Sequence, residues 1–200
     1  SVGQGLCLRH YGFRPDVIRR SDGHESGPLV LGYRLQSSDT PMDYRLLVYE
    51  KGAFILHMLR MMLMDIETGD DMPFRDLMRA FVDDHLHGVA STRSFEAAVT
   101  RAFGEPMTWF FDQWVYGVDV PTYRLDLEVS RLVDQDAPYL LHGTIRQEDV
   151  PEDFRMPVPI MIHFDGRPPM VRRVWVDADE VEVEIPLPAE PTDTDFNYQH

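Results

Sequence analysis

Residues 44–66 read YRLLVYEKGAFILHMLRMMLMDI, and apolar side chains at helical spacing predict one long helix over this whole range. Further Leu, Ile, Met and Ala residues widen the apolar stripe until it nearly encircles the helix, as in helices that are buried inside a larger assembly. Yet the helix also carries Tyr49-Glu50-Lys51-Gly52, three polar side chains and a glycine that costs about 1 kcal/mol relative to Ala. Polar groups in a buried helix need partners, or they have a chemical role.

The pattern on either side of this helix divides the chain into two parts. Residues 1–43 are irregular, and after the long helix we expect further helices over 73–87, over 94–103 with Thr92 as N-cap, and from Pro106 through Trp114. Beyond residue 121 apolar and charged residues alternate over 123–129 and 181–185, which predicts two strands. Between them, segments separated by turn-rich pieces predict three more, over 139–147, 157–164 and 170–176. We therefore expect a helical part over residues 1–120, with 1–43 as its irregular lead-in, and a small antiparallel β-sandwich over 121–200.

Composition limits the classes of function. The formal net charge of −15 argues against nucleic acid and against an anionic membrane surface. No apolar run approaches the ~20 residues that a membrane span needs, so we expect a soluble protein. The single cysteine, Cys7, excludes an intrachain disulfide framework and leaves the cellular compartment unknown. The start has neither an initiator Met nor a signal-peptide pattern, and we expect it to lie inside a longer protein.

A search for metal ligands and nucleophiles finds no site in the chain. Eight histidines are present, but none belongs to an HExxH zinc motif, and we expect His57 to be a satisfied buried residue. Cys7 lacks an activating neighbour, and no Ser lies in a Gly-x-Ser-x-Gly turn. Carboxylates are clustered in predicted turns and helix ends, where we expect solvated charge: Asp70/Asp71, Asp83/Asp84 and Asp177/Asp179/Glu180.

Tyr49 has two possible interpretations from spacing alone. Its hydroxyl has one donor, which a rigid helix could hold at the rim of a cavity to stabilise an oxyanion on a substrate carbonyl. In the other interpretation Tyr49 is a buried tyrosine whose hydroxyl bonds a neighbouring carbonyl.

A family resemblance bears on this choice. Tyr44-x-x-x-x-Tyr49-Glu50-Lys51-Gly52-Ala53 and the residues that follow resemble the zinc aminopeptidases of the aminopeptidase N type, a gluzincin family that includes leukotriene hydrolase. Trp109 to Val115, followed by Gly117 to Pro121, resembles the exit of that family into its small β-sandwich. The resemblance covers most of the chain and is clearest from about 44 to 125. It implies an α+β multidomain fold, with the helical half of a thermolysin-like catalytic domain followed by the β-sandwich.

The resemblance also implies roles for particular residues. Tyr49 matches the family's catalytic tyrosine, which hydrogen-bonds the oxyanion of the tetrahedral intermediate. Tyr44 matches an aromatic position near the pocket for the first substrate side chain, and we assign Glu50 and Lys51 to local ion pairing and helix support. In that family the HExxH zinc ligands, a further Glu ligand and the Gly-x-Met-Glu-Asn loop that grips the substrate amine all precede the tyrosine. None of them is present in this sequence.

The resemblance predicts a fragment of a zinc-dependent aminopeptidase that removes N-terminal residues from peptides. Alone, the chain should bind no zinc and cleave nothing, and the surface exposed by truncation should favour self-association. A second interpretation is a non-catalytic member of the same fold that acts as a binding or scaffold module. A third is an independent acidic binding module, which accounts for the charge but not for the Tyr-Glu-Lys-Gly helix.

Overall fold

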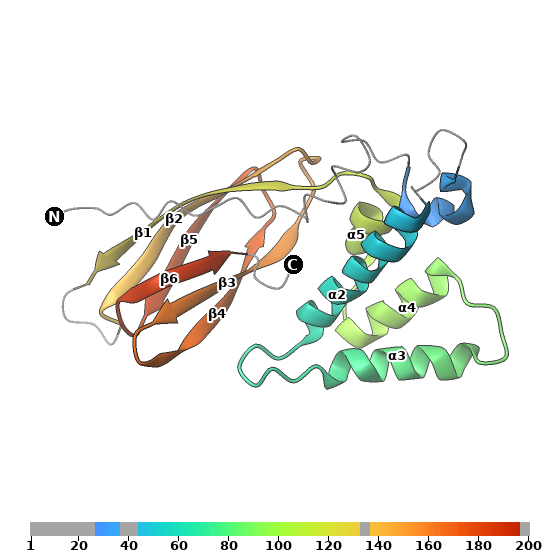
Figure 1. The fold of residues 1–200 in the computed structure, drawn as a ribbon, viewed down its shortest axis with the longest axis horizontal. Helices are drawn as coiled ribbons and strands as arrows, with labels where there is room; N and C mark the ends of the chain where they lie inside the picture. The colour runs from blue at the N-terminus through green and yellow to red at the C-terminus, as the bar shows by residue number, and fades with distance from the viewer. Residues whose placement is uncertain (1–26, 37–43, 133–136, 197–200) are drawn as a thin grey trace. The chain divides into compact units, whose positions relative to one another are not determined.

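The computed structural model describes residues 27–36, 44–132 and 137–196, and it has an α+β fold (Figure 1). Two compact units divide the chain near residue 120: a helical unit, Pro15–Asp119, and a unit of strands that takes in Val120–His200. The irregular lead-in predicted over 1–43 falls largely outside the described residues, as does Cys7. Among the helices of the described ranges, none is both long enough and apolar enough to cross a membrane.

The predicted helix over 44–66 is present in two successive forms. The π-helix η2 (Arg45–Lys51) continues directly into the α-helix α2 (Gly52–Leu63). At Gly52 the backbone N–H reaches back to the carbonyl of Leu47, five residues earlier, which is the hydrogen-bond spacing of a π-helix. The helix ends three residues earlier than predicted, because Met64 is already extended with ψ 135°. The short 3₁₀ segment η1 (Leu29–Leu35) contacts η2.

The next helices differ from their predicted bounds mainly at the ends. α3 (Met72–His85) begins with Pro73 in its first turn, where a missing N–H costs nothing. For α4 (Thr92–Phe103) the predicted N-cap was one residue off: Ser91, not Thr92, accepts from the Ser94 N–H and forms a capping box with it. The same helix ends at Gly104, whose φ of 74° suits glycine. The fourth predicted helix is α5 (Thr108–Phe111), which continues as the π-helix η3 (Asp112–Tyr116).

The core of the helical unit forms where the apolar sides of these helices meet. α2 contributes Ile55, Met58, Leu59 and Met61, and α5 and η3 contribute large aromatic side chains. The further buried apolar members are Leu35, Leu47, Leu77, Ala98, Val99, Met107, Phe110, Phe111, Trp114 and Val115. Lys51 is also completely buried, whereas its neighbour Glu50 is exposed. Of the two residues that we assigned to ion pairing and helix support, only Lys51 therefore lies in the core.

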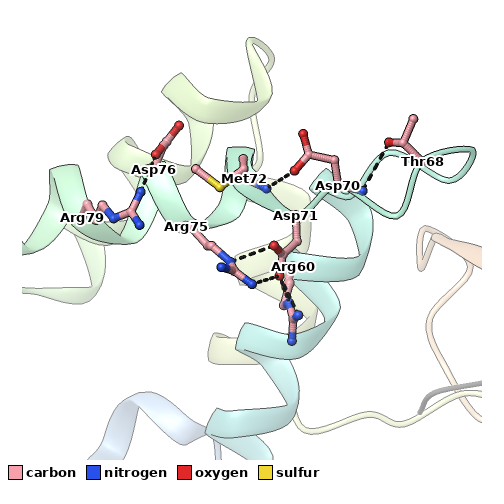
Figure 2. A network of polar contacts seen from close by, with 8 residues as sticks. All are labelled: Arg60, Thr68, Asp70, Asp71, Met72, Arg75, Asp76 and Arg79. Atoms are coloured by element: carbon pink, nitrogen blue, oxygen red, sulfur yellow. Dashed lines mark hydrogen bonds and ion pairs between the residues drawn. The ribbon is translucent and has the colours of Figure 1, made fainter.

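Asp71 corrects one expectation from the sequence. We expected Asp70 and Asp71 to carry solvated charge, but Asp71 is buried between the end of α2 and the start of α3 (Figure 2). Its carboxylate accepts from Arg60 Nε at 2.7 Å and pairs with Arg75 Nε at 2.8 Å. Asp70 is exposed and accepts from the Met72 backbone N–H at 2.9 Å. Two cations on different helices make burial of this carboxylate tolerable.

The strands form two antiparallel sheets. One sheet has the order β1-β2-β5 and the other β4-β3-β6. The bounds are β1 (Thr122–Arg131), β2 (Tyr139–Glu148), β3 (Met156–Phe164), β4 (Arg167–Val176), β5 (Glu180–Leu187) and β6 (Pro191–Phe196). Alternating burial is clear in β5, where Val183, Ile185 and Leu187 are buried between exposed residues. The ring of Tyr123 in β1 contacts that of Phe196 in β6, with the centroids 5.7 Å apart.

Candidate functional site

Tyr49 lies on η2, and its side chain is 62% exposed. The helix that holds it continues into α2, whose inner side is part of the core. The exposed ring is therefore attached to a well-packed helix. The interpretation of Tyr49 as a buried tyrosine is therefore wrong.

The π-helical turn brings Tyr44 beside Tyr49. On an α-helix, residues five apart are rotated by about 140° and point in different directions. A π-helix instead bonds residue i to residue i+5, which places such residues almost one above the other. The two rings accordingly meet edge to face, with centroids 5.7 Å apart and planes at 89°. The two residues singled out from the sequence thus lie together.

A third tyrosine, Tyr33, completes the cluster and was missed from the sequence. Its ring stacks on that of Tyr44 with centroids 4.4 Å apart and planes at 12°. Tyr33 lies in η1 directly after Gly32, whose backbone has φ 54° and ψ −126°, a conformation that glycine adopts easily. No regular spacing relates position 33 to 44 and 49, so only the packing of η1 against η2 places it there. We call Tyr33, Tyr44 and Tyr49 the tyrosine cluster.

The tyrosine cluster changes the acidity of Tyr44. The pKa of Tyr44 lies above its ordinary value of 10.0: the neighbouring Tyr33 hydroxyl raises it most, and desolvation and the Tyr49 hydroxyl raise it further. Tyr44 is therefore a neutral phenol at physiological pH and can donate a hydrogen bond.

A separate apolar pocket of about 350 Å³ lies among the helices of this unit. Gly52, Ile55 and Leu56 of α2 line one part of it, and the remaining lining residues are Leu29, Phe81, Ala90, Ser91, Thr92, Phe95, Phe111 and Val115. None of the three tyrosines lines it. The pocket is an apolar space of the size that a small ligand or a large side chain fills.

Metal ligands were sought within the described ranges. In residues 27–36, 44–132 and 137–196, no group of three or more His, Cys, Asp or Glu side chains is arranged to hold a metal ion. His85 forms a hydrogen bond through its Nδ1, which lies 2.9 Å from the Phe81 carbonyl oxygen, and His57 packs edge to face on Phe54. The described residues therefore do not supply a zinc site.

Comparison with known proteins yields a likeness of fold. No protein-family model matches the chain, and no curated protein matches it. Among solved structures, the crystal structure of Legionella pneumophila aminopeptidase A in complex with aspartic acid is similar, with a TM-score of 0.52 and 17% sequence identity. The match covers 92% of this chain and 20% of that protein. This chain has an aminopeptidase-like fold and spans about a fifth of the length of that aminopeptidase.

Proposed function

We propose that this chain is part of a zinc-dependent aminopeptidase of the aminopeptidase N type, in which the Tyr49 hydroxyl stabilises the tetrahedral oxyanion. The observation that carries the proposal is the exposed Tyr49 side chain on a helix whose inner side is part of the core. The likeness of fold to an aminopeptidase supports the reaction class. In that class a water attacks the first peptide carbonyl, and negative charge develops on the carbonyl oxygen.

Tyr49 suits the role of an oxyanion donor for two physical reasons. A phenol has one O–H that can point at the developing charge. A donor held by a packed helix also needs little rearrangement when the charge forms, which is what makes such donors effective. Loss of one such donor commonly lowers kcat by roughly 10²–10³.

Tyr44 is proposed to contact the first side chain of the peptide substrate. Its half-buried ring lies beside Tyr49, so a substrate whose carbonyl reached Tyr49 would pass close to Tyr44. Its flat apolar face and its neutral hydroxyl fit an amino-acid side chain at that place.

We assign the metal and the recognition of the substrate amine to parts of the whole protein other than the described residues. On this proposal the helical unit is half of a thermolysin-like catalytic domain, and the two sheets form the β-sandwich that follows it. The isolated chain should neither bind stoichiometric zinc nor cleave peptides, and its self-association stays a prediction.

The whole protein in its source cells offers the direct test. An antibody raised against this chain should detect a band several times larger than 23.2 kDa. Depleting the extract with the same antibody should remove both the band and a chelator-sensitive activity on aminoacyl-p-nitroanilides, which eluted protein should restore. A band near 23.2 kDa, with the activity left in the extract, would overturn the proposal and favour a binding or scaffold module.

A further inference from the structure

Gly52 has no structural reason to be glycine within the described part of the chain. Its backbone has φ −60° and ψ −43°, a regular helical conformation in which alanine is the better helix former. An added Cβ would meet Leu29 Cδ1 at 3.6 Å, which is an ordinary contact. Neither the backbone conformation nor crowding by the described residues therefore requires glycine at this position. A glycine in a helix also permits another backbone to approach closely, and that reason is left.

Gly52 forms part of the wall of the apolar pocket, whose volume is about 350 Å³. Well-packed interiors contain few voids larger than a water molecule, so a space of this size is not a packing defect. Leu56, Phe81 and Phe95 also line the pocket and are only half buried, although the rings of Phe81 and Phe95 meet edge to face with centroids 5.0 Å apart. The chain therefore leaves apolar surface open beside Gly52, as interaction sites do.

The chemistry of the wall selects an apolar occupant. Of the described residues that line the pocket, none is charged, and only Ser91 and Thr92 have polar side chains. The Ser91 hydroxyl already accepts a hydrogen bond from the Ser94 backbone N–H. A polar ligand would therefore lose its hydration without gaining enough partners, whereas aliphatic and aromatic side chains would gain from burial.

We propose that a helix from the zinc-binding half of the whole protein docks across Gly52 and fills this pocket with large apolar side chains. This inference rests on the proposed function and names the surface through which the two halves of the catalytic domain join. The match to the aminopeptidase covers 92% of this chain but only 20% of that protein, which leaves the greater part of such a protein to supply the helix. Packed helices lie about 8–10 Å apart, depending on the side chains at the contact, and glycine allows the closest approach.

The position of Gly52 on its helix agrees with this assignment. Tyr49 precedes Gly52 by three residues, less than one helical turn, and η2 continues into α2 without a break. A helix that docks across Gly52 therefore reaches the level of Tyr49 along this helix. The proposed oxyanion donor and the metal must act on the same substrate carbonyl, and docking at this surface would bring the two together.

Thiol labelling locates the occupant without a measurement of activity. Leu56→Cys places a thiol in the pocket wall, and Ala97→Cys places one at an exposed position of α4. In this chain alone both variants should react readily with N-ethylmaleimide, measured on the modified peptide by mass spectrometry. In the whole protein Leu56→Cys should react at least roughly 10-fold more slowly, because buried thiols are inert, while Ala97→Cys should react as before.

Two labelling results would overturn the inference. One is an equal rate for Leu56→Cys in this chain and in the whole protein, which would mean that no other part of the protein covers the pocket. The other is slow labelling in this chain that becomes faster on dilution, which would mean that a second copy of the chain fills the pocket.

Gly52→Ala tests the close approach of the docked helix. In this chain it should raise Tm by up to roughly 4 °C, because alanine favours the helix. In the whole protein the same methyl group would lie between two packed helices, so Tm and zinc content should both fall. Ala97→Gly, at the exposed position, should lower Tm in both proteins. A rise in Tm for Gly52→Ala in both proteins would overturn the inference.

Failure of this inference can be distinguished from failure of the proposed function. If Tyr49→Phe abolishes turnover while Leu56→Cys labels equally fast in this chain and in the whole protein, only the docking surface is wrong. A native protein near 23.2 kDa without peptidase activity would instead overturn the proposed function, and the docked zinc-binding half with it.

Discussion

The Arg60 guanidinium donates to the Asp71 carboxylate from the last turn of α2 to the residue before α3, with 2.7 Å between Nε and Oδ2. Arg75, one turn into α3, holds the other oxygen (Figure 2). Desolvation would raise the pKa of Asp71, but the hydrogen bonds and charges of Arg60 and Arg75 outweigh it and lower that pKa below 3.8. The carboxylate thus ties α2 to α3 as long as it is ionised.

We expect Asp71→Asn to destabilise the chain at pH 7, because it leaves two cations facing a neutral amide. The folded-state pKa of Asp71 is lowered, so its stabilisation is fully present above pH 4 or so and is lost as the pH falls through the folded-state value. The Tm difference between wild type and variant should therefore shrink on acidification. Asp76→Asn is the control, since Asp76 forms an exposed i,i+3 pair with Arg79 and should change Tm little. An equal change in Tm for both variants at pH 7 would mean that the buried Asp71 carboxylate stabilises the fold no more than the exposed Asp76 does.

Tyr123→Phe should stabilise the unit of strands. Tyr123 is 8% exposed, and none of the described residues gives its buried hydroxyl a hydrogen bond. Removing an unsatisfied buried hydroxyl while keeping the ring against Phe196 should gain about 1 kcal/mol in urea unfolding at pH 7.

The same substitution, Tyr123→Phe, should also change how the stability of the fold depends on pH in the alkaline range. Burial raises the pKa of Tyr123 above 10.0, so its neutral form is favoured in the fold. That contribution is fully present below pH 10 or so and is lost as the pH rises toward the folded-state value. The advantage of Tyr123→Phe should therefore widen in that range. Tyr139→Phe, which removes a hydroxyl bonded to Glu190 at the surface, serves as the control. A destabilised Tyr123→Phe would mean that the hydroxyl has a partner after all.

Gly52→Ala should stabilise the helical unit by up to about 1 kcal/mol, the difference in helix propensity. Gly52 has φ −60° and ψ −43°, which any residue adopts, and an added Cβ would meet Leu29 Cδ1 at 3.6 Å, an ordinary contact. Gly104→Ala is the matched control, because its φ of 74° should make alanine there cost about 1 kcal/mol. Thermal unfolding of both variants checks the opposite signs; a loss of stability in Gly52→Ala contradicts the expectation.

Periodicity predicted the features that depend on local pattern. Alternation of apolar and charged residues located β1 and β5, and turn-rich pieces between them located β2, β3 and β4. The strand β6 (PTDTDF) was missed because a largely polar segment buries only Thr194 and Phe196. The predicted helices are present, yet the pattern does not distinguish a π-helical turn from an α-helical one in η2.

Features that depend on contacts between residues far apart in the chain could not be predicted from the sequence pattern. Asp71 is buried because Arg60, eleven residues earlier, reaches it, and adjacent acidic residues look the same whether one is buried or both are solvated. Tyr44 and Tyr49 stood out through their motif, whereas Tyr33 belongs to the cluster only because η1 packs on η2.

The central claim is that Tyr49 donates a hydrogen bond to the oxyanion, and kcat of Tyr49→Phe in the whole protein tests it most directly. The account predicts a loss of roughly 10²–10³ in kcat, with zinc content and Tm unchanged and KM little altered. Tyr116→Phe, prepared in parallel, should turn over normally. A Tyr49→Phe protein with full zinc content and near-normal kcat would contradict the account.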